Sequence, residues 1–176
     1  MQLAPKLLTD KSRLQEIYDL RVDAYEQSAH SEFVNRELYP NGWFDFLEED
    51  SYHYIVEVEN KIVASARLSI LSSFQDFITL GNDTDESLIP PERPFALYSR
   101  LVISTEYRGI GISSQIDRVI IEKMWELRVP FCIAGCRDER LDSLLRKGFL
   151  RVGEVLEIKK TKSEVAHFIL IRNPYL

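Results

Sequence analysis

The alternation of hydrophobic and polar residues predicts paired strands in the first half of the chain. In residues 62–71, small and apolar side chains alternate with Ser65, Arg67 and Ser69. This is the pattern of a strand with one buried face. The run 53–58 precedes it across three polar residues, so the two stretches are expected to form a hairpin.

A different period marks residues 112–128, where apolar side chains recur three and four positions apart. That spacing predicts an amphipathic helix. The strand-like run 95–103 precedes the helix, and Pro130, which cannot continue a helix, separates it from the apolar run 131–135. The order strand, helix, strand predicts a crossover unit with two neighbouring, roughly parallel strands.

The other patterns extend this series without a visible repeat or linker, so we expect residues 1–176 to form a single domain. The predicted order is β, α, α, β, β, β, α, β, α, β, β. The further expected elements are a strand at 3–8, helices at 14–25, 29–35 and 138–147, a long loop at 81–94, and a final hairpin of 152–158 and 164–171.

Composition and charge argue against several classes of protein. The net charge of −6 argues against binding to nucleic acid or to an anionic membrane. No apolar run reaches the ~20 residues that span a bilayer, and the first residues lack the pattern of a signal peptide. Cys132 and Cys136, four residues apart in or at the end of one predicted strand, would lie ~13 Å apart, too far for a disulfide. We therefore expect a reduced, cytoplasmic protein, and the three scattered histidines predict no metal site.

The turn before the long helix carries the most specific chemistry. Gly109 and Gly111 have no Cβ to keep another molecule away from the backbone. The first N–H groups of a helix lack internal partners and carry partial positive charge, so a diphosphate could bind there. Arg108 would add a full charge. The alternative is that both glycines only form a tight turn.

The local sequence favours the first interpretation. Arg108-Gly109-Ile110-Gly111-Ile112-Ser113 resembles the Arg/Gln-x-x-Gly-x-Gly/Ala signature of the GNAT acyltransferase superfamily. Residues 101–107 and 147–149 resemble its Leu-x-Val-x-Pro and Leu-Gly-Phe segments. The predicted order of elements is also that of the GNAT fold. The resemblance implies a single-domain α/β (α+β) fold, with a mixed, mostly antiparallel sheet of about seven strands flanked by about four helices.

The competing motif is the dinucleotide fingerprint Gly-x-Gly-x-x-Gly. Gly109 and Gly111 begin it, but Ser114 occupies the third glycine position. Asp138 stands near the end of the next strand, where a ribose-binding acid is expected. The chain beyond it is too short for the rest of a doubly wound sheet.

The GNAT resemblance implies an N-acyltransferase that moves an acyl group from acetyl-CoA or another acyl-CoA to the amine of a small molecule or amino acid, by direct attack on the thioester. The acyl-CoA would lie between the strand at 101–103 and the strand at 131–134. Its pantetheine arm would meet the backbone of Leu101, Val102 and Ile103. The amides of residues 108–113 would hold its diphosphate; these residues are Arg108, Gly109, Ile110, Gly111, Ile112 and Ser113.

The proton-handling residues of the family are replaced here. Ser99 stands where many relatives have glutamate, and Arg137 and Leu144 stand where they often have asparagine and tyrosine. Tyr98 is our candidate catalytic residue. Cys136, a water molecule or the leaving thiolate itself are the alternatives.

Two arginines, Arg67 and Arg100, lie in otherwise apolar predicted strands and require partners. One hypothesis is a salt bridge to Glu57, Glu59 or a neighbour, and the other is an acceptor carboxylate. The second hypothesis agrees with a weaker resemblance of this sequence to the acyl-homoserine lactone synthase branch of the superfamily. Leu97, however, stands where that branch has a glutamate. An acyl-homoserine-lactone-like or long-chain N-acyl amino acid synthase, and a non-catalytic acyl-CoA sensor, therefore stay as alternatives. A homodimer is left open.

Overall fold

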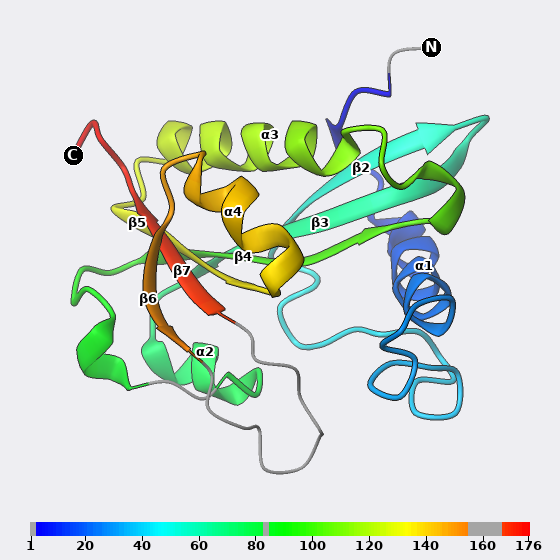
Figure 1. Cartoon of the computed structure of the whole chain (residues 1–176), viewed down its shortest axis with the longest axis horizontal. Helices are drawn as coiled ribbons and strands as arrows, with labels where there is room; N and C mark the ends of the chain where they lie inside the picture. Colours follow the sequence, from blue (N-terminus) through cyan, green and yellow to red (C-terminus); the bar gives the residue numbers. More distant parts are fainter. Residues whose placement is uncertain (1–2, 83–84, 155–166) are drawn as a thin grey trace. The chain divides into compact units, whose positions relative to one another are not determined.

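The computed structural model describes residues 3–82, 85–154 and 167–176, in which seven strands form one mixed sheet accompanied by four α-helices (Figure 1). The strand order is β1-β2-β3-β4-β5-β7-β6. The strands are β1 (Lys6–Leu7), β2 (Tyr52–Val58), β3 (Lys61–Leu71), β4 (Phe95–Ile103), β5 (Phe131–Cys136), β6 (Leu150–Glu154) and β7 (His167–Arg172), and the helices are α1 (Leu14–Glu26), α2 (Phe74–Thr79), α3 (Ile112–Glu126) and α4 (Asp138–Leu145).

The predicted mixed, mostly antiparallel sheet is confirmed. β4 and β5 are parallel, while β1–β2, β2–β3, β5–β7 and β6–β7 are antiparallel pairs. The parallel pair is the predicted crossover around α3, and it aligns Ala96 with Cys132 and Tyr98 with Ala134. Cys132 and Cys136 are free and buried, as their spacing predicts. None of the helices in the described residues is long and apolar enough to cross a membrane.

The chain divides into two compact units, which we describe separately. The first comprises Met1–Leu68 and Arg100–Ile120, and the second comprises Ser69–Ser99 and Ile121–Leu176. β3, β4 and α3 each contribute residues to both units.

In the first unit, α1 packs on the sheet through the apolar positions that its helical period predicts. Asp10 caps the short 3-10 turn that leads into the helix by accepting from the backbone N–H of Ser12. The buried side chains that the helix and sheet share are Leu14, Ile17, Leu20, Ala24, Ile55, Ile62 and Val102. This cluster fixes α1 against β2, β3 and the end of β4.

The hairpin of β2 and β3 also forms where the sequence predicts it. Glu59 and Asn60 both have positive φ angles, 50° and 64°, as a two-residue turn of type I′ requires. The predicted one-sided burial of β3 is wrong, however, because every residue from Ile62 to Ser69 is buried. The polar face of β3 is covered as well, and Arg67, 1% exposed, is neutralised there by carboxylates.

The second unit has an aromatic core. The rings of Phe95 and Phe131 stack with centroids 5.3 Å apart, and Phe77 lies 5.4 Å from Phe168. β5, β7 and β6 run side by side (Figure 1). α4 follows β5 directly and ends before Gly148, whose φ of 97° suits the predicted glycine stop.

Several predicted elements need correction. Residues 29–35 form turns instead of a helix, and the second helix is instead α2, after β3, capped by the Ser73 hydroxyl. The loop at 81–94 contains a short 3-10 turn at Glu86–Leu88. In the final hairpin β6 begins at Leu150 and β7 at His167, and the predicted turn at 159–162 lies outside the described residues.

Candidate active site

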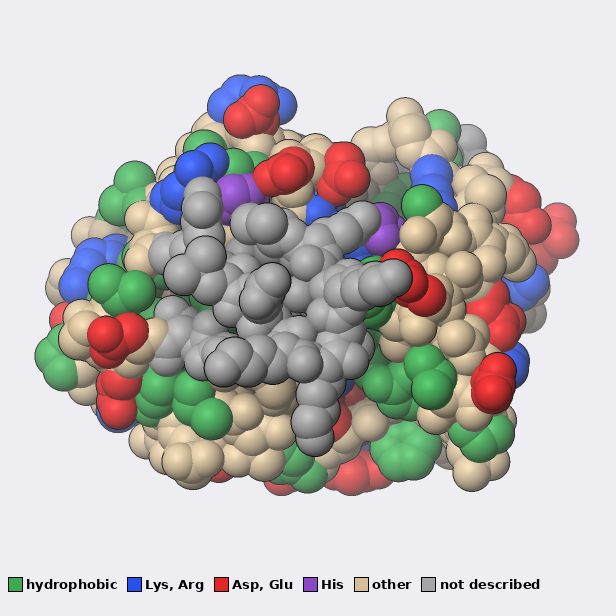
Figure 2. Space-filling view, turned by 60° about the horizontal axis from the view of Figure 1, so that its bottom comes forward, with side chains coloured by type: hydrophobic (Ala, Val, Ile, Leu, Met, Phe, Trp, Pro, Cys, Tyr) green, Lys and Arg blue, Asp and Glu red, His purple; other side chains and the backbone are tan. Residues whose placement is uncertain are grey.

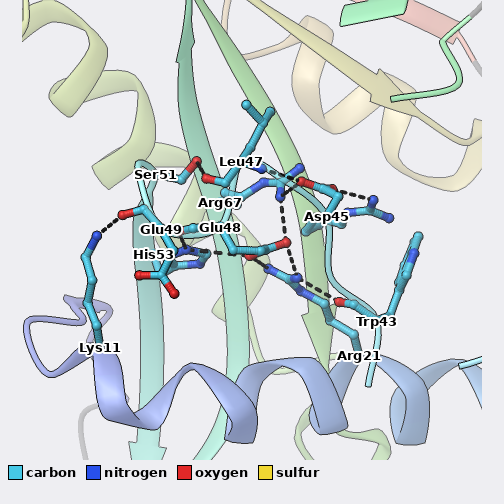
Figure 3. Close-up of polar contacts among 11 residues, drawn as sticks. Lys11, Arg21, Trp43, Asp45, Leu47, Glu48, Glu49, Ser51, His53 and Arg67 are labelled. Atoms are coloured by element: carbon cyan, nitrogen blue, oxygen red, sulfur yellow. Dashed lines mark hydrogen bonds and ion pairs between the residues drawn. The ribbon is translucent and has the colours of Figure 1, made fainter. Parts of the chain in front are cut away.

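A buried cluster of charged side chains lies in the first unit. It consists of Arg21 on α1, Arg67 on β3, Arg100 on β4, and Asp45 and Glu48 from the segment between α1 and β2; we call these five residues the arginine cluster. Figure 3 shows Arg21 reaching from α1 and Arg67 from β3 toward Glu48. Sequence analysis predicts the two strand arginines but not the acids that meet them.

Glu48 is the centre of the cluster and is only 2% exposed. Arg21 donates to both of its carboxylate oxygens, at 2.7 and 3.1 Å, which is the strong bidentate geometry. Arg67 donates to the same Oε1 atom at 2.6 Å. Since Arg21 and Arg67 are 0% and 1% exposed, their charges depend on protein partners instead of water.

Asp45 joins the other two arginines. Arg67 Nη1 donates to Asp45 Oδ1 at 2.6 Å, and Arg100 Nη2 donates to Oδ2 at 2.7 Å. Burial raises the pKa of Asp45, but the hydrogen bonds and positive charges of Arg67 and Arg100 outweigh it and hold that pKa far below its usual value. Burial also lowers the pKa of Arg100, against the opposing effect of Asp45.

The approach of the loop to α1 depends on Gly42. Its φ is 91°, and an added Cβ would lie 2.5 Å from Tyr18 Cβ. This close approach lets Trp43 N–H donate to Tyr18 O at 3.1 Å and brings Trp43 O within 2.9 Å of Arg21 Nη1. The Trp43 ring then stacks on Arg100 of β4, whose guanidinium is 3.8 Å from the ring centroid.

His53 on β2 lies beside Glu48 (Figure 3). Its Nε2 lies 2.8 Å from Glu48 O and 3.6 Å from Glu48 Oε2, and the residue is 2% exposed. Burial is the main cause that lowers the pKa of His53, so the imidazole is neutral at neutral pH. A neutral donor to the Glu48 carbonyl fixes this loop without adding charge.

Arg67 and Arg100 therefore each form a salt bridge with an acid, but these acids are Asp45 and Glu48 and not Glu57. Glu57 pairs with Lys6 and Arg13 instead. The segment 43–50 contains four acids among aromatic residues, and a buried strand arginine implies a carboxylate somewhere, but spacing alone does not single out Asp45 and Glu48.

The glycine turn has the open backbone that a diphosphate site needs. Gly109 and Gly111 have φ angles of 78° and 86°, and a Cβ built on either meets no atom within 4 Å. Gly111 directly precedes α3, whose first N–H groups have no partner inside the helix. Arg108 was expected to add positive charge to the diphosphate site. Its guanidinium instead donates to Ile103 O at 3.1 Å and Ala24 O at 2.8 Å. It ties the turn to α1.

The other predicted cofactor residues lie on the same stretch. Val102 is 5% exposed and packs in the core with α1, whereas Leu101 and Ile103 are half-buried. Ile112 is 1% exposed, and Ile110 is 57% exposed. Any contact of Val102 or Ile112 with a cofactor would therefore involve the backbone.

The backbone of β4 has an unusual conformation just after the predicted catalytic residue. Tyr98, 4% exposed, aligns with Ala134 in the last aligned pair of β4 and β5. Two residues later Arg100 has a φ of 59°, a left-handed conformation that is rare for a side chain other than glycine or asparagine. β5 itself continues to Cys136 alongside β7.

A cavity of about 300 Å³ lies beside α1 in the same unit. Four of its lining residues are acids, namely Glu16, Asp19, Asp23 and Glu106. Arg13 pairs with Glu16, and Arg36 pairs with Asp19 and Asp23. None of residues 108–113 lines this cavity, so it is not the expected nucleotide site. Among the described residues, no group of histidine, cysteine and acidic side chains could hold a metal ion. On the face displayed in Figure 2, acidic and basic side chains are interspersed.

The chain is similar in fold to several solved acyltransferases. FeeM, an N-acyl amino acid synthase from uncultured soil microbes, has a TM-score of 0.69 and 11% identity over 97% of this chain and 91% of its own. The ribosomal-protein-alanine N-acetyltransferase of Brucella melitensis has a TM-score of 0.65 and 19% identity over 97% and 99%. BjaI, a CoA-dependent acyl-homoserine lactone synthase solved with SAM and isopentyl-CoA, has a TM-score of 0.66 and 14% identity over 93% and 77%.

Sequence comparison identifies the family directly. No curated protein matches the chain. The sequence pattern of the acetyltransferase (GNAT) family matches residues 14–145, from the first residue of α1 to the last of α4. This match spans the glycine turn and all five members of the arginine cluster. The protein therefore belongs to the acetyltransferase (GNAT) family and is an acyl-CoA-dependent N-acyltransferase.

Proposed function

We propose that this protein transfers an acyl group, acetyl in the simplest case, from acyl-CoA to the amino group of a small acceptor that also carries a carboxylate, such as an amino acid. The observation that carries the proposal is the charge of the arginine cluster. Three guanidinium groups share two carboxylates, Asp45 and Glu48, so the cluster has one positive charge in excess. An acceptor carboxylate would balance it.

Arg100 is the arginine that is suited to meet the acceptor. Its side chain is 15% exposed, whereas those of Arg21 and Arg67 are 0% and 1% exposed. Its hydrogen bond to Asp45 uses Nη2, and a guanidinium has five N–H donors. Stacking on Trp43 fixes its plane. The left-handed backbone at Arg100 costs about 1–2 kcal/mol, and such strain is found where a side chain must be aimed.

Arg67 belongs to the proposed acceptor site through Asp45, which it shares with Arg100. Asp45 accepts hydrogen bonds from both arginines and so holds Arg100 in place. The positive charge of Arg67 keeps Asp45 ionised. This arrangement leaves Arg100 free to bind a second carboxylate with its other nitrogen atoms, in the bidentate manner that arginine favours.

For the donor, we propose that backbone groups of Leu101, Val102 and Ile103 bind the pantetheine arm and that the amides of residues 108–113 bind the diphosphate. The open space at Gly109 and Gly111 supports this assignment. Tyr98 is the proposed side chain beside the reacting groups, at the last aligned pair of β4 and β5.

A longer acyl group is the second candidate. The similarity in fold to FeeM, an N-acyl amino acid synthase, and to BjaI, an acyl-homoserine lactone synthase, favours it. Lactone formation is less well supported, because Leu97 replaces the glutamate of that branch and is a buried core residue, 3% exposed.

The test uses matched acceptors. The protein is incubated with acetyl-CoA and with pairs such as phenylalanine and phenethylamine, which differ in one carboxylate, and released thiol is measured. A charge-assisted hydrogen bond of about 1.5–3 kcal/mol predicts a kcat/KM ratio of about ten to one hundred in favour of the amino acid. Replacing acetyl-CoA by donors of increasing chain length tests the second candidate. Tight CoA binding without turnover on any donor would indicate a sensor.

The Arg100→Gln variant sharpens this test. It should raise KM for the amino acid, leave KM for acetyl-CoA unchanged and abolish the preference within the acceptor pair. Arg172→Gln is the matched control, since Arg172 is 57% exposed and pairs only with Glu92 on the surface among the described residues. An equal loss with phenylalanine and phenethylamine would contradict the assignment of Arg100.

A further inference from the structure

We propose that Trp43 is a positioning residue that holds Arg100 ready for the acceptor carboxylate. The inference rests on the proposed function, in which Arg100 binds that carboxylate. Trp43 lies in the segment between α1 and β2, and Arg100 lies on β4. Both residues belong to the first unit. The guanidinium of Arg100 lies 3.8 Å from the centroid of the Trp43 ring, so the ring covers one of its faces.

The hydrogen bonds of Arg100 constrain its guanidinium less than those of the other two arginines in the cluster. Arg21 donates to both oxygens of Glu48, and Arg67 donates to Asp45 as well as to Glu48. The guanidinium of Arg100 makes one such bond, from Nη2 to Asp45 Oδ2 at 2.7 Å. A single bond lets the planar group turn about the N–H···O direction, whereas a bidentate pair fixes it. Stacking on an aromatic ring supplies the missing constraint.

Trp43 is itself held by its backbone and by two neighbouring rings. Its backbone N–H donates to Tyr18 O at 3.1 Å, and its carbonyl oxygen accepts from Arg21 Nη1 at 2.9 Å. The ring of Tyr25 meets the indole edge-on, with centroids 5.2 Å apart and 78° between the planes, and the ring of Tyr39 lies 5.9 Å away. Edge-to-face pairs of this kind are favourable. The indole is therefore a rigid support for the guanidinium.

The stack limits the directions from which an anion can reach Arg100. Trp43 covers one face of the guanidinium, and Asp45 occupies Nη2. The other N–H donors lie in the plane of the group. A carboxylate that meets them in this plane makes the bidentate contact that arginine favours. Because the guanidinium is already oriented, less conformational entropy is lost when the acceptor binds.

This role predicts an effect on the acceptor and not on the donor. The proposed donor contacts are backbone groups of residues 101–103 and 108–113, and the indole touches neither stretch in the contacts described above. Loss of the Trp43 ring should therefore raise KM for an acceptor that has a carboxylate. The KM for acetyl-CoA should not change.

The test compares Trp43→Leu, which removes the aromatic face, with Trp43→Phe, which keeps one. We expect Trp43→Leu to raise KM for phenylalanine about tenfold, as the loss of a partly buried cation–π contact predicts. KM for acetyl-CoA and for phenethylamine, which has no carboxylate, should stay within about twofold of the parent. Trp43→Phe should recover most of the loss. Phe44→Leu is the matched control, since Phe44 is 52% exposed and its ring packs on Tyr18 at 5.1 Å.

A double-mutant cycle separates positioning from general support of the loop. In the Arg100→Gln background, Trp43→Leu should cause no further rise in KM for phenylalanine, because the group that it positions is absent. General support of the loop would give two losses that add.

Tryptophan fluorescence measures the same event without turnover. The chain has two tryptophans, so Trp125→Phe leaves Trp43 as the only one. Phenylalanine should change the emission of this variant with a midpoint near its KM, since the carboxylate alters the charge that lies on the indole. Phenethylamine should leave the emission unchanged.

The outcomes distinguish this inference from the proposed function. A parent that prefers phenylalanine to phenethylamine, together with a Trp43→Leu variant that keeps the full preference, would overturn the role of Trp43 alone. Additive losses in the cycle, or an emission that saturating phenylalanine does not change, would also overturn it. A parent without any preference within the pair would contradict carboxylate binding by Arg100, and the positioning role would fail with it.

Discussion

Replacing Glu48 by glutamine is the most informative perturbation of the arginine cluster. The change keeps the shape of the side chain and one oxygen acceptor but removes the negative charge. Arg21 and Arg67, 0% and 1% exposed, would then face an amide, and only Asp45 would remain to balance Arg67. The amide N–H groups of glutamine would also face the N–H groups of the two arginines, and neither could accept a hydrogen bond from the other.

The expected loss follows from the burial of both arginines. Removing one partner of a buried ion pair costs about 3–5 kcal/mol, because the remaining charge stays uncompensated. This is a large share of a stability of about 5–15 kcal/mol. For a chain of this size it corresponds to a fall in Tm of about 6–20 °C. A surface pair would cost about 0–1 kcal/mol.

Urea unfolding, followed by far-UV circular dichroism and tryptophan fluorescence, measures the loss. Glu49→Gln is the matched control, since Glu49 is the next residue and is exposed. We expect that control to stay within about 0.5 kcal/mol of the parent. Combining Glu48→Leu with Arg21→Met should recover much of the stability that Glu48→Gln loses, because both charges are then absent. Equal losses in the two glutamine variants would refute the argument that Glu48 neutralises buried arginines.

Three further outcomes are expected. Gly111→Trp should abolish coenzyme A binding by calorimetry while Gly81→Trp, at a position with the same φ of 86° and the same open space, should not; equal affinities would remove the glycine turn from the donor site. Asp45→Asn should destabilise the protein at pH 7, and because the folded pKa of Asp45 is lowered, the difference from the parent in urea unfolding should shrink as pH falls below about 4; a constant difference would contradict it. Gly42→Ala should lower Tm and raise KM for the acceptor, since its Cβ would collide with Tyr18; an unchanged Tm would contradict the close approach.

Local patterns predicted the elements that carry the proposed donor site. The three- and four-residue period of α3, the proline after it and the two glycines before it each depend on neighbouring residues only. The crossover of β4 and β5 follows from their order and is confirmed by the register. The helix expected at 29–35 did not form, because the backbone there makes turns, with Phe33 N–H donating to His30 O. The next residue, Arg36, is held by α1, since its backbone N–H donates to Glu26.

The sequence predicted only the arginines of the proposed acceptor site and not its acids, for an electrostatic reason. An arginine in an apolar strand shows that a compensating charge must exist, since an isolated buried charge is too costly. It does not show which acid supplies the charge, and the four acids of the segment 43–50 are equivalent until the loop closes on α1. Closure selects Asp45 and Glu48, leaves Glu49 exposed and sets the cluster's charge at three guanidiniums to two carboxylates. That excess of one, on which the proposed preference for an acceptor carboxylate rests, is a property of the folded loop and not of any local motif.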